Sequence, residues 1–530
     1  MPIKKPNEVW RPSLDDESPT DGRSFTVAST TRLPSTSVCS YYKRQEPRSV
    51  RWLVDAAPTE STTTTYQKKK NTMSVELFTM PSTDITVDSY RMIPYSAAMT
   101  GIVPVTFTVP GLDEFVDLGR SFFEIELKLN SASTNGIVTD ANSASDANNT
   151  KFVYVTNNLA HGLFKQINLR LGGVLMSEQT DTYMYKSFIE TLLNYSRDEG
   201  DTLLAPQGWV NYLNVEEQLA AAGGDDDIST TAGWAHNSTN ALKTATKLFY
   251  GNNKATMIMY PHLAAMRTGR LLVPRVEMVM ELFCNTPDFF LFGTKTSGTG
   301  VKRYVTLGAG DIKVTFHLCR VNLNVSVGNE LMAKIDVKGQ MANYPMVKSQ
   351  IRTFSFDGKT TLWTEDQIFT GRLPDRLVVG LLDSKAFNGD LEYYPYAFQD
   401  FGVKSIRQLV GGEEYPYPTL ELNGTNTRKD WLGYQRLLEA SGSLANHRPH
   451  MIQPGDWGYG KNCTLFMFNN VPSGNADSPY HRNPKQKGKL RLEIRFNAAP
   501  DKNITILVFG EFEDSFQAGT NGNILYQKYE

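Results

Sequence analysis

The sequence predicts an all-β protein made of two tandem jelly-roll β-sandwiches with long loop insertions and a few short helices, preceded by a disordered N-terminal arm. Three observations predict this class. From Ser74 onward, short segments alternate apolar and polar residues with the period of two that half-buried strands show. Only two segments have helical periodicity. The 530 residues also exceed the roughly 250–300 at which a single core stops growing.

The composition of residues 1–72 predicts a disordered N-terminal arm. They are rich in Ser, Thr, Pro and charge, they lack a sustained apolar period, and they hold 12 Lys and Arg against 8 Asp and Glu. The run Lys68–Lys70 is typical of a charged linker, with a phosphate-binding patch as the alternative. A second interpretation is that the folded protein starts at Met73 and that the preceding residues are an extension.

In the first half, every second residue is apolar in four segments that predict strands: 105–109, 123–129, 167–171 and 276–282. A stripe of Met184, Phe188, Leu192 and Tyr195 predicts a helix capped by Asp181. The long polar stretches 131–150 and 218–253 predict loops that a rigid sheet scaffold carries at one end.

In the second half, alternation resumes at residues 312–318, slips by one residue near Arg320, and continues at 323–327. This slip predicts a β-bulge. Residues 490–496 and 504–512 predict an antiparallel pair that closes a sheet. A second helix is predicted near Thr427, with Trp431, Tyr434 and Leu438 on one face and Gly442 beyond its end. Because each helix follows several strands in its half, the pattern favours a duplicated β-rich unit.

These elements predict the domain boundaries. We expect the arm at 1–73, the first jelly roll at 74–300, the second at 301–518 and a C-terminal tail at 519–530, with residues 294–300 as the linker between the sandwiches.

Residues 377–389 combine an apolar run with a turn-like segment, and they contain no obvious nucleophile, base or metal ligand. Residues 377–382, LVVGLL, are apolar on both faces and predict a buried strand. A turn-like segment follows and ends in Asn388-Gly389, after which comes the aromatic run 393–398. Such a run is more typical of a loop anchored on a sheet or interface than of a sugar or base platform.

Composition excludes several classes of protein. The net charge of −2 gives no global field that would favour nucleic acid or an anionic membrane surface. Four distant cysteines without a CxxC pair predict neither a zinc site nor a disulfide framework, which fits a reducing compartment: Cys39, Cys284, Cys319 and Cys463. No signal-peptide h-region and no run of about 18 apolar residues occurs, so we expect no secretion and no membrane insertion.

Candidate metal and cofactor motifs are incomplete. His447 and His450 have the i, i+3 spacing of a ligand pair, but Pro449 opposes a helix there and a hydrogen-bonded loop is favoured. Residues 225–227, three aspartates, lack the ligand order of a calcium loop. Gly308-Ala-Gly310 is too short for a dinucleotide fingerprint and precedes a strand. We therefore expect no metal and no cofactor.

Enzyme motifs are likewise absent, since no P-loop, GxSxG or HExxH sequence occurs. The remaining enzyme hypothesis is a dispersed hydrolase site that combines Cys284 or Cys319 with His317. Because His317 lies in an apolar alternation, a packed strand residue is favoured, and we expect no enzyme.

Several long segments resemble a known family of proteins. They begin with SVELFTMPSTDITVDS at Ser74 and PVTFTVPGLDEFVDLGRSFFEIELKL, and continue with IFTGRLPDRLVVGLLDSKAFNGDLEYYPYAFQDFGVKSIRQLVGGEEYP, RKDWLGYQRLLEASG and KLRLEIRFNAAPDKNITILVFGEFED. These segments resemble the double-jelly-roll, hexon-like major capsid proteins of Polinton/Maverick elements and adintovirus-like viruses, including endogenous copies in animal genomes. The resemblance spans residues 74–514, and the loops and arm depart from it.

The resemblance implies a structural protein of an icosahedral virion. Three chains would form a trimer of six sandwiches with a pseudo-hexagonal outline, and trimers would contact neighbouring capsomers. Further implied partners are penton and minor capsid proteins, and packaged DNA through the arm; assembly would occur inside the host cell. The residues expected to be structural or to lie at interfaces are Phe387, Asn388, Gly389, Tyr393, Tyr394, Tyr396, Phe398, Trp431 and Tyr434.

Two alternatives belong to other classes of function. A cellular tandem β-sandwich module could bind glycans or peptides through its aromatic loops. A dispersed enzyme site could depend on His317 or His447. A penton or minor capsid role is disfavoured, because one jelly roll would suffice for it.

Overall fold

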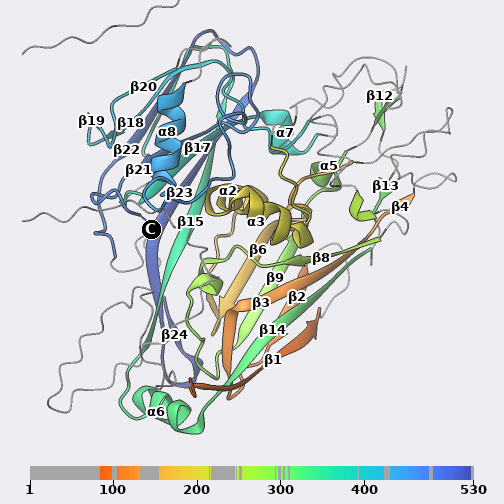
Figure 1. Cartoon of the computed structure of the whole chain (residues 1–530), viewed down its shortest axis with the longest axis vertical. Helices are drawn as coiled ribbons and strands as arrows, with labels where there is room; N and C mark the ends of the chain where they lie inside the picture. Colours follow the sequence, from red (N-terminus) through yellow and green to blue (C-terminus); the bar gives the residue numbers. More distant parts are fainter. Residues whose placement is uncertain are drawn as a thin grey trace, which may run out of the picture. The chain divides into compact units, whose positions relative to one another are not determined.

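Figure 1 shows the computed structural model of the chain. All residues that the structure describes belong to the unit of residues 63–530. The described residues are 84–97, 104–131, 154–213, 215, 245, 247–249, 254–292, 294–296, 300–302, 305–307, 311–369, 371–390, 393–422, 430–476 and 482–526. The predicted arm, most of the predicted loops 131–150 and 218–253, and residues 225–227 lie outside this set.

The first sandwich consists of two antiparallel sheets. Sheet 1A contains, in spatial order, β1 (Val87–Ser96), β14 (Ile312–Leu323), β3 (Phe115–Lys128) and β8 (Lys254–Met259). Sheet 1B contains β2 (Val105–Val109), β9 (Met278–Cys284), β6 (Phe164–Leu171) and β7 (Val174–Leu175). The alternating apolar residues point between the sheets, where the ring of Phe107 packs on Phe123 and Phe316.

The second sandwich is built in the same way. Sheet 2A contains β15 (Ala342–Phe356), β23 (Ile504–Ala518), β17 (Arg376–Asp383) and β21 (Leu465–Asn469), with β24 (Ile524–Leu525) added on β23. Sheet 2B contains β16 (Leu362–Asp366), β22 (Leu490–Phe496), β18 (Val403–Val410) and β19 (Glu413–Glu414), with β20 (Leu420–Glu421) added on β18. Phe356 stacks on Phe496 across this core.

Both sandwiches have one topology. When the eight strands on the two four-stranded paths of each sandwich are counted in chain order, with β20 and β24 left out, one sheet has the order first, eighth, third, sixth and the other has the order second, seventh, fourth, fifth. Two such sheets of four strands form a jelly roll. The predicted fold class is therefore confirmed, and the predicted duplication is present in the strand order.

Short helices and small sheets decorate the sandwiches. The α-helices are α1 (Leu159–Gly162), α2 (Tyr183–Asn194), α3 (Arg197–Thr202), α5 (Pro287–Phe290), α6 (Val325–Asp336), α7 (Ser384–Asn388) and α8 (Trp431–Ala440). The 3-10 helices are η1 (Ala205–Gln207), η2 (Lys247–Phe249), η3 (Ala264–Arg267) and η4 (Thr520–Gly522). The two-stranded sheets pair β10 (Leu291–Phe292) with β5 (Tyr154–Val155), β11 (Thr294–Thr296) with β12 (Gly300–Lys302), and β13 (Val305–Thr306) with β4 (Asn130–Ser131). No described helix is long and apolar enough to cross a membrane.

The two predicted helices are confirmed as α2 and α8, and they occupy equivalent places. Each lies in the connection between the fifth and the sixth strand of its sandwich. The residue at the start of α2 is Thr182 and not the predicted cap Asp181. Asp181 instead forms an ion pair with Lys165.

The strand at residues 312–323 belongs to the first sandwich, because β14 pairs with β1 on one side and β3 on the other. The predicted boundary at residue 300 is therefore too early. A register shift lies close to the predicted slip, between His317 and Cys319, but its extra residues lie on β3 and not on β14, because His317 is opposite Phe122 and Cys319 is opposite Asp117. The predicted strand beyond Leu323 is wrong, since Asn324 accepts a hydrogen bond from the Ser326 N–H and starts α6.

The predicted pair of residues 490–496 and 504–512 is also wrong. β22 pairs with β16 and β18 in sheet 2B, whereas β23 pairs with β15 and β17 in sheet 2A. The two strands face each other across the core, so both show the inward apolar alternation that suggested neighbours. The predicted tail is partly ordered into the fold, because β24 pairs with the end of β23.

Candidate functional site at the junction of the two sandwiches

The apolar segment 377–382 forms the centre of β17. All eight residues of β17 are buried, because sheet 2B covers one face and a junction with the first sandwich covers the other. The turn-like residues that follow form α7, where the Asp383 carboxylate accepts a hydrogen bond from the Lys385 N–H and Gly389 ends the helix at φ 80°. The predicted buried strand is confirmed.

Aromatic rings fill this junction. The ring of Tyr396 lies parallel to that of Phe188 on α2, with centroids 4.1 Å apart. The ring of Phe387 stacks on Tyr185 of the same helix at 5.3 Å. Phe398 lies over Gly380 of β17, where a Cβ atom would stand 2.5 Å from its ring. Aromatic rings of the second sandwich therefore pack directly on aromatic rings of α2, which belongs to the first sandwich.

Most of the residues predicted for interfaces are located at this junction. Tyr394, Tyr396 and Phe398 are at most 2% exposed. Tyr393 is buried beneath the Lys385 ammonium, 5.2 Å from its ring centroid. Asn388 is the last residue of α7, and Gly389 lies against Phe289 of the first sandwich.

The other two predicted residues lie on α8. Tyr434 is half-buried and donates a hydrogen bond from its hydroxyl to the Ile452 carbonyl at 3.0 Å. Trp431 is 57% exposed. Whether these two residues contact another protomer stays a prediction.

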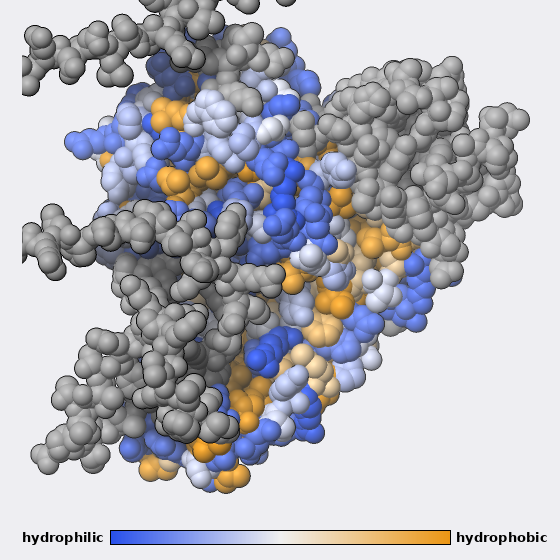
Figure 2. Space-filling model, viewed as in Figure 1, coloured by the Kyte–Doolittle hydropathy of each residue, from blue (hydrophilic) through white to orange (hydrophobic). Residues whose placement is uncertain are grey.

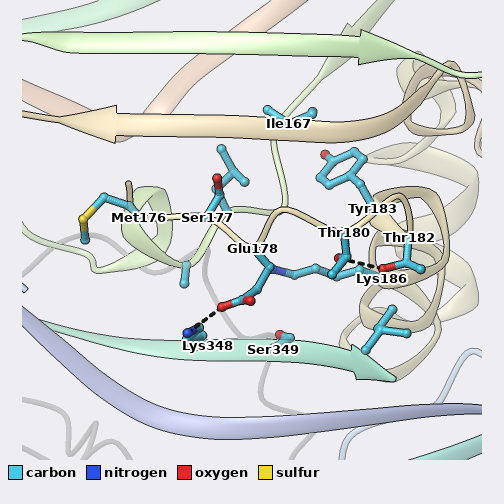
Figure 3. Close-up of a pocket in the computed structure, with 13 residues that line it drawn as sticks. Ile167, Met176, Ser177, Glu178, Thr180, Thr182, Tyr183, Lys186, Lys348 and Ser349 are labelled. Carbon is cyan, nitrogen blue, oxygen red and sulfur yellow. Dashed lines mark hydrogen bonds and ion pairs between the residues drawn. The ribbon is translucent and has the colours of Figure 1, made fainter. Parts of the chain in front are cut away.

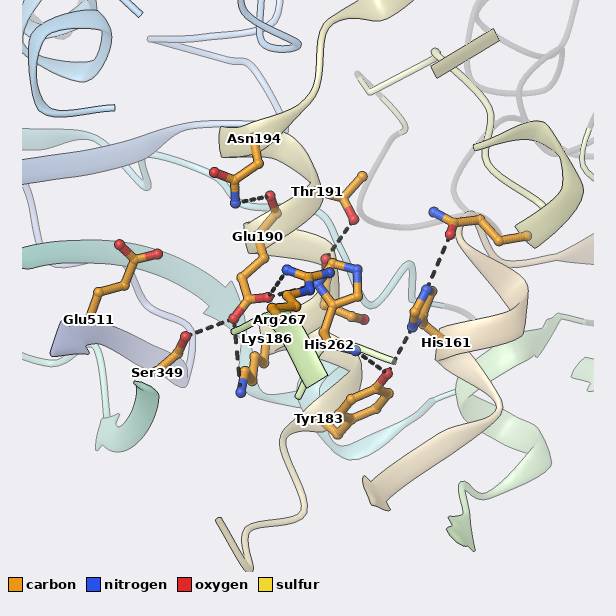
Figure 4. Close-up of polar contacts among 12 residues, drawn as sticks. His161, Tyr183, Lys186, Glu190, Thr191, Asn194, His262, Arg267, Ser349 and Glu511 are labelled. Carbon is orange, nitrogen blue, oxygen red and sulfur yellow. Dashed lines mark hydrogen bonds and ion pairs between the residues drawn. The ribbon is translucent and has the colours of Figure 1, made fainter. Parts of the chain in front are cut away.

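A buried carboxylate, Glu190 on α2, lies at the polar centre of the junction (Figure 4). It accepts hydrogen bonds from His262 Nδ1 at 2.7 Å, from Arg267 Nη1 at 3.0 Å and from Ser349 Oγ at 2.7 Å. The Lys186 ammonium is 3.9 Å away on the preceding turn. Since Ser349 lies on β15, Glu190 joins the two sandwiches.

The charges around Glu190 decide its protonation. Burial alone would raise the pKa of the Glu190 carboxyl, but Lys186, the His262 hydrogen bond and Arg267 together lower it well below its usual value. Burial lowers the pKa of His262 to about 4. Burial also lowers the pKa of His161, which contacts the Tyr183 hydroxyl at 3.0 Å. Near neutral pH the centre is thus an ionised glutamate with neutral histidines.

Further contacts fasten the sandwiches along the same seam. Lys348 of β15 forms an ion pair with Glu178 at 2.5 Å, at the edge of a small pocket lined by Thr180, Thr182 and Lys186 (Figure 3). The pocket charges are paired within the chain, so it offers no excess charge to a ligand. Nearby, the Tyr344 hydroxyl donates to the Leu271 carbonyl at 3.0 Å.

At the other end of the seam, a loop of the second sandwich contacts the C-terminal end of α2 and the start of α3. The Arg448 guanidinium donates to the Leu193 carbonyl at 2.9 Å. Arg197, at the start of α3, donates to the Met451 carbonyl at 3.2 Å and pairs with the Asp456 carboxylate. Together these contacts hold the sandwiches in one fixed arrangement.

The sequence did not single out Glu190 or His262. The i, i+4 pair of Lys186 and Glu190, visible in the sequence beside the apolar stripe of α2, was the available signal. Its partners come from residues more than 70 positions away. Spacing alone could not reveal them.

The residues of the enzyme and metal hypotheses do not converge. His317 stacks on Phe122 at 4.8 Å and pairs with Glu124, while His450 accepts a hydrogen bond from the Ile452 N–H. Burial raises the pKa of Cys284 and Cys319 to about 11, so both thiols are protonated near neutral pH. Among the described residues, no group of three or more His, Cys, Asp or Glu side chains could hold a metal ion.

Comparisons with known proteins place the fold. No family model matches the sequence. A chain of the cryo-EM structure of the Sputnik virophage is similar with a TM-score of 0.51 and 8% identity, over 90% of this chain and 94% of that one. The mavirus major capsid protein aligns with a TM-score of 0.46 and 11% identity, over 89% of this chain and 97% of that one.

A sequence relative also exists in an animal. The uncharacterized protein F54H12.2 of Caenorhabditis elegans is 24% identical over 361 residues, which cover 68% of this chain and 78% of that protein.

The buried histidines predict acid sensitivity. For His262, and for His450 whose pKa burial also lowers to about 4, the folded pKa lies below the usual 6.5. The unfolded chain therefore binds more protons between pH 6.5 and 4, and stability falls as the pH falls through this window. We expect a loss of about 2 kcal/mol for each of these histidines between pH 7 and pH 5. Urea unfolding at the two pH values measures this, and the change His450→Gln should remove its share. Equal stability at both pH values would contradict the assignment.

The close approach of Phe398 to β17 predicts a steric limit at Gly380. The change Gly380→Ala should lower the free energy of unfolding by about 1–3 kcal/mol, because the added methyl group must displace a packed ring. The matched control is Gly455→Ala, where no atom lies within 4 Å of the added carbon. Thermal unfolding compares the variants, and equal melting temperatures would disprove the contact.

Proposed function

We propose that this chain is the major capsid protein of a DNA virus, or of an integrated element derived from one, and that it assembles as a homotrimer. The observation that carries the proposal is the pair of sandwiches with one strand order, fixed side by side through a buried junction. The similarity in fold to the Sputnik virophage chain supports it. The role is structural and requires no cofactor.

Two sandwiches of one topology in each chain suit the assembly of a trimer into a shell. Three chains supply six sandwiches of one topology, so a trimer can present six similar sides to its neighbours in a shell. Closed rings of identical chains form when each copy offers two complementary surfaces. The fixed junction keeps the angle between the sandwiches constant, which such a ring requires.

The more specific assignment rests on the sequence segments that resemble the capsid proteins of Polinton/Maverick elements and adintovirus-like viruses. We propose that the chain belongs to this group. Its partners would be neighbouring capsomers, penton and minor capsid proteins, and packaged DNA contacted by the basic arm. It would be located in the virion.

The alternative of a glycan- or peptide-binding module is weakened by the aromatic run at residues 393–398. Tyr394, Tyr396 and Phe398 are buried, the last two against rings of α2, and they offer no exposed platform. An assembly role needs no such platform.

The proposal predicts a defined mass in solution. Light scattering of the purified full chain should give three times the 59.4 kDa of one copy, and negative-stain images should show particles with a hexagonal outline. A monodisperse monomer at micromolar concentration would contradict the proposal.

A further inference from the structure

The outer face of sheet 1A is covered only in part. Helix α6 packs over Cys319 and Val321 through Leu331 and Met332, and no described element fully covers the rest of the face. Register places Met92 of β1 opposite Cys319, and Pro94 opposite His317. His317 lies in turn opposite Phe122 of β3. Because directly opposed residues of antiparallel strands share one face, these side chains form rows across the sheet. The ring of Phe122 lies 4.8 Å from that of His317 and 5.6 Å from that of Tyr260, which follows β8.

Large apolar side chains stand exposed on this face. Tyr90 is 61% exposed, Met92 39%, Ile258 36% and Tyr260 50%. Figure 2 shows hydrophobic residues in orange interspersed with hydrophilic ones in blue over the lower part of the view, where Figure 1 draws the first sandwich. Charged side chains border them, for example Glu126, whose carboxylate pairs with Lys254 at 2.7 Å. An apolar patch with a charged rim, next to the long edge strand β1, is typical of a protein contact surface.

The equivalent face in the second sandwich is covered within the chain. Ser349, opposite Glu511, lies on the outer face of sheet 2A, as does Gly380. Helix α2 reaches this face, where Glu190 accepts the Ser349 hydrogen bond and Phe188 packs near Phe398. Thus the helix between the fifth and sixth strands of the first sandwich covers the sheet of the second.

The second sandwich carries a helix in the same connection. One side of α8 is buried on its own sandwich through Leu437 and Ala440. Its opposite side exposes Leu432 by 56% and Trp431 by 57%. The chain therefore contains two helices in equivalent connections. Among the described residues, α2 packs on sheet 2A of the other sandwich, whereas α8 packs on β21 of its own sandwich.

We propose that α8 of one copy docks on the outer face of sheet 1A of the next copy, as α2 docks on sheet 2A within the chain. The inference rests on the proposed trimer and names its contact. Leu432 and Trp431 would bury against Met92, Phe122 and Tyr260. The contact joins two different surfaces and therefore closes a ring by rotation.

Site-directed cross-linking tests this contact in the full chain. All variants carry Cys39→Ser, because Cys39 lies outside the described residues. The other three cysteines are buried, so a short bismaleimide acts mainly on introduced thiols. A chain with both Met92→Cys and Leu432→Cys should give covalently linked dimers and trimers. The matched control pairs Leu432→Cys with Leu362→Cys, because Leu362 is 45% exposed but lies on sheet 2B. Linked products only in the control, or equally in both, would overturn the proposal.

Substitution provides a second readout. The changes Leu432→Ser and Tyr260→Ser should each weaken the trimer about tenfold or more, as loss of an anchor residue at an interface does, while Leu362→Ser should leave it unchanged. Light scattering over a dilution series measures this. A wild-type monomer would overturn both the trimer and this contact. A wild-type trimer that both changes leave intact would overturn the contact alone.

Discussion

The arrangement of this protein depends on one constraint: the outer face of sheet 2A is apolar and must be kept from water. β17 is buried on both faces, and Gly380 leaves space for the ring of Phe398 above it. A β-sandwich alone buries only the inner faces of its sheets. Part of the cover comes from α8, which packs on β21, and part comes from α2, which belongs to the other sandwich. Separating the sandwiches would therefore expose apolar surface of sheet 2A to water.

The polar centre of this contact sets its register. A buried carboxylate is costly unless every lone pair finds a donor. Glu190 meets that requirement with His262 and Arg267 from its own sandwich and with Ser349 from the other. A displacement of α2 along the sheet by one residue would remove the Ser349 contact and leave the aromatic rings out of register. Apolar burial thus provides the attraction between the sandwiches, and the Glu190 contacts select one position.

The sequence predicted elements better than it predicted their partners. Alternation revealed the strands because each half-buried strand carries its own pattern, and the stripes of α2 and α8 did the same for helices. Alternation says nothing about which sheet a strand joins, so β14 was assigned to the wrong sandwich and β22 to the wrong neighbour. In α6, Val327, Leu331 and Ile335 fit a helical stripe, but Val325 and Val327 also fit a strand, and the Asn324 cap decides. The junction was foreseen as aromatic, whereas its charged centre depends on contacts distant in sequence.

The outer faces of the sheets differ in a way that the jelly roll itself does not require. On sheet 2B, the buried carboxylate of Glu493 pairs with Arg407 at 2.7 Å and with Arg491 at 2.8 Å, and both arginines are partly exposed, so this face carries charge toward water. Sheet 2A is covered inside the chain. Sheet 1A presents exposed rings and methyl groups to water, although it shares the strand order of sheet 2A. If duplication produced two equivalent faces, the chain covers the second with α2 but the first only in part, where α6 packs over Cys319 and Val321. Under the proposed contact, another copy would cover the remainder, and the exposed face and assembly would follow from the same duplication.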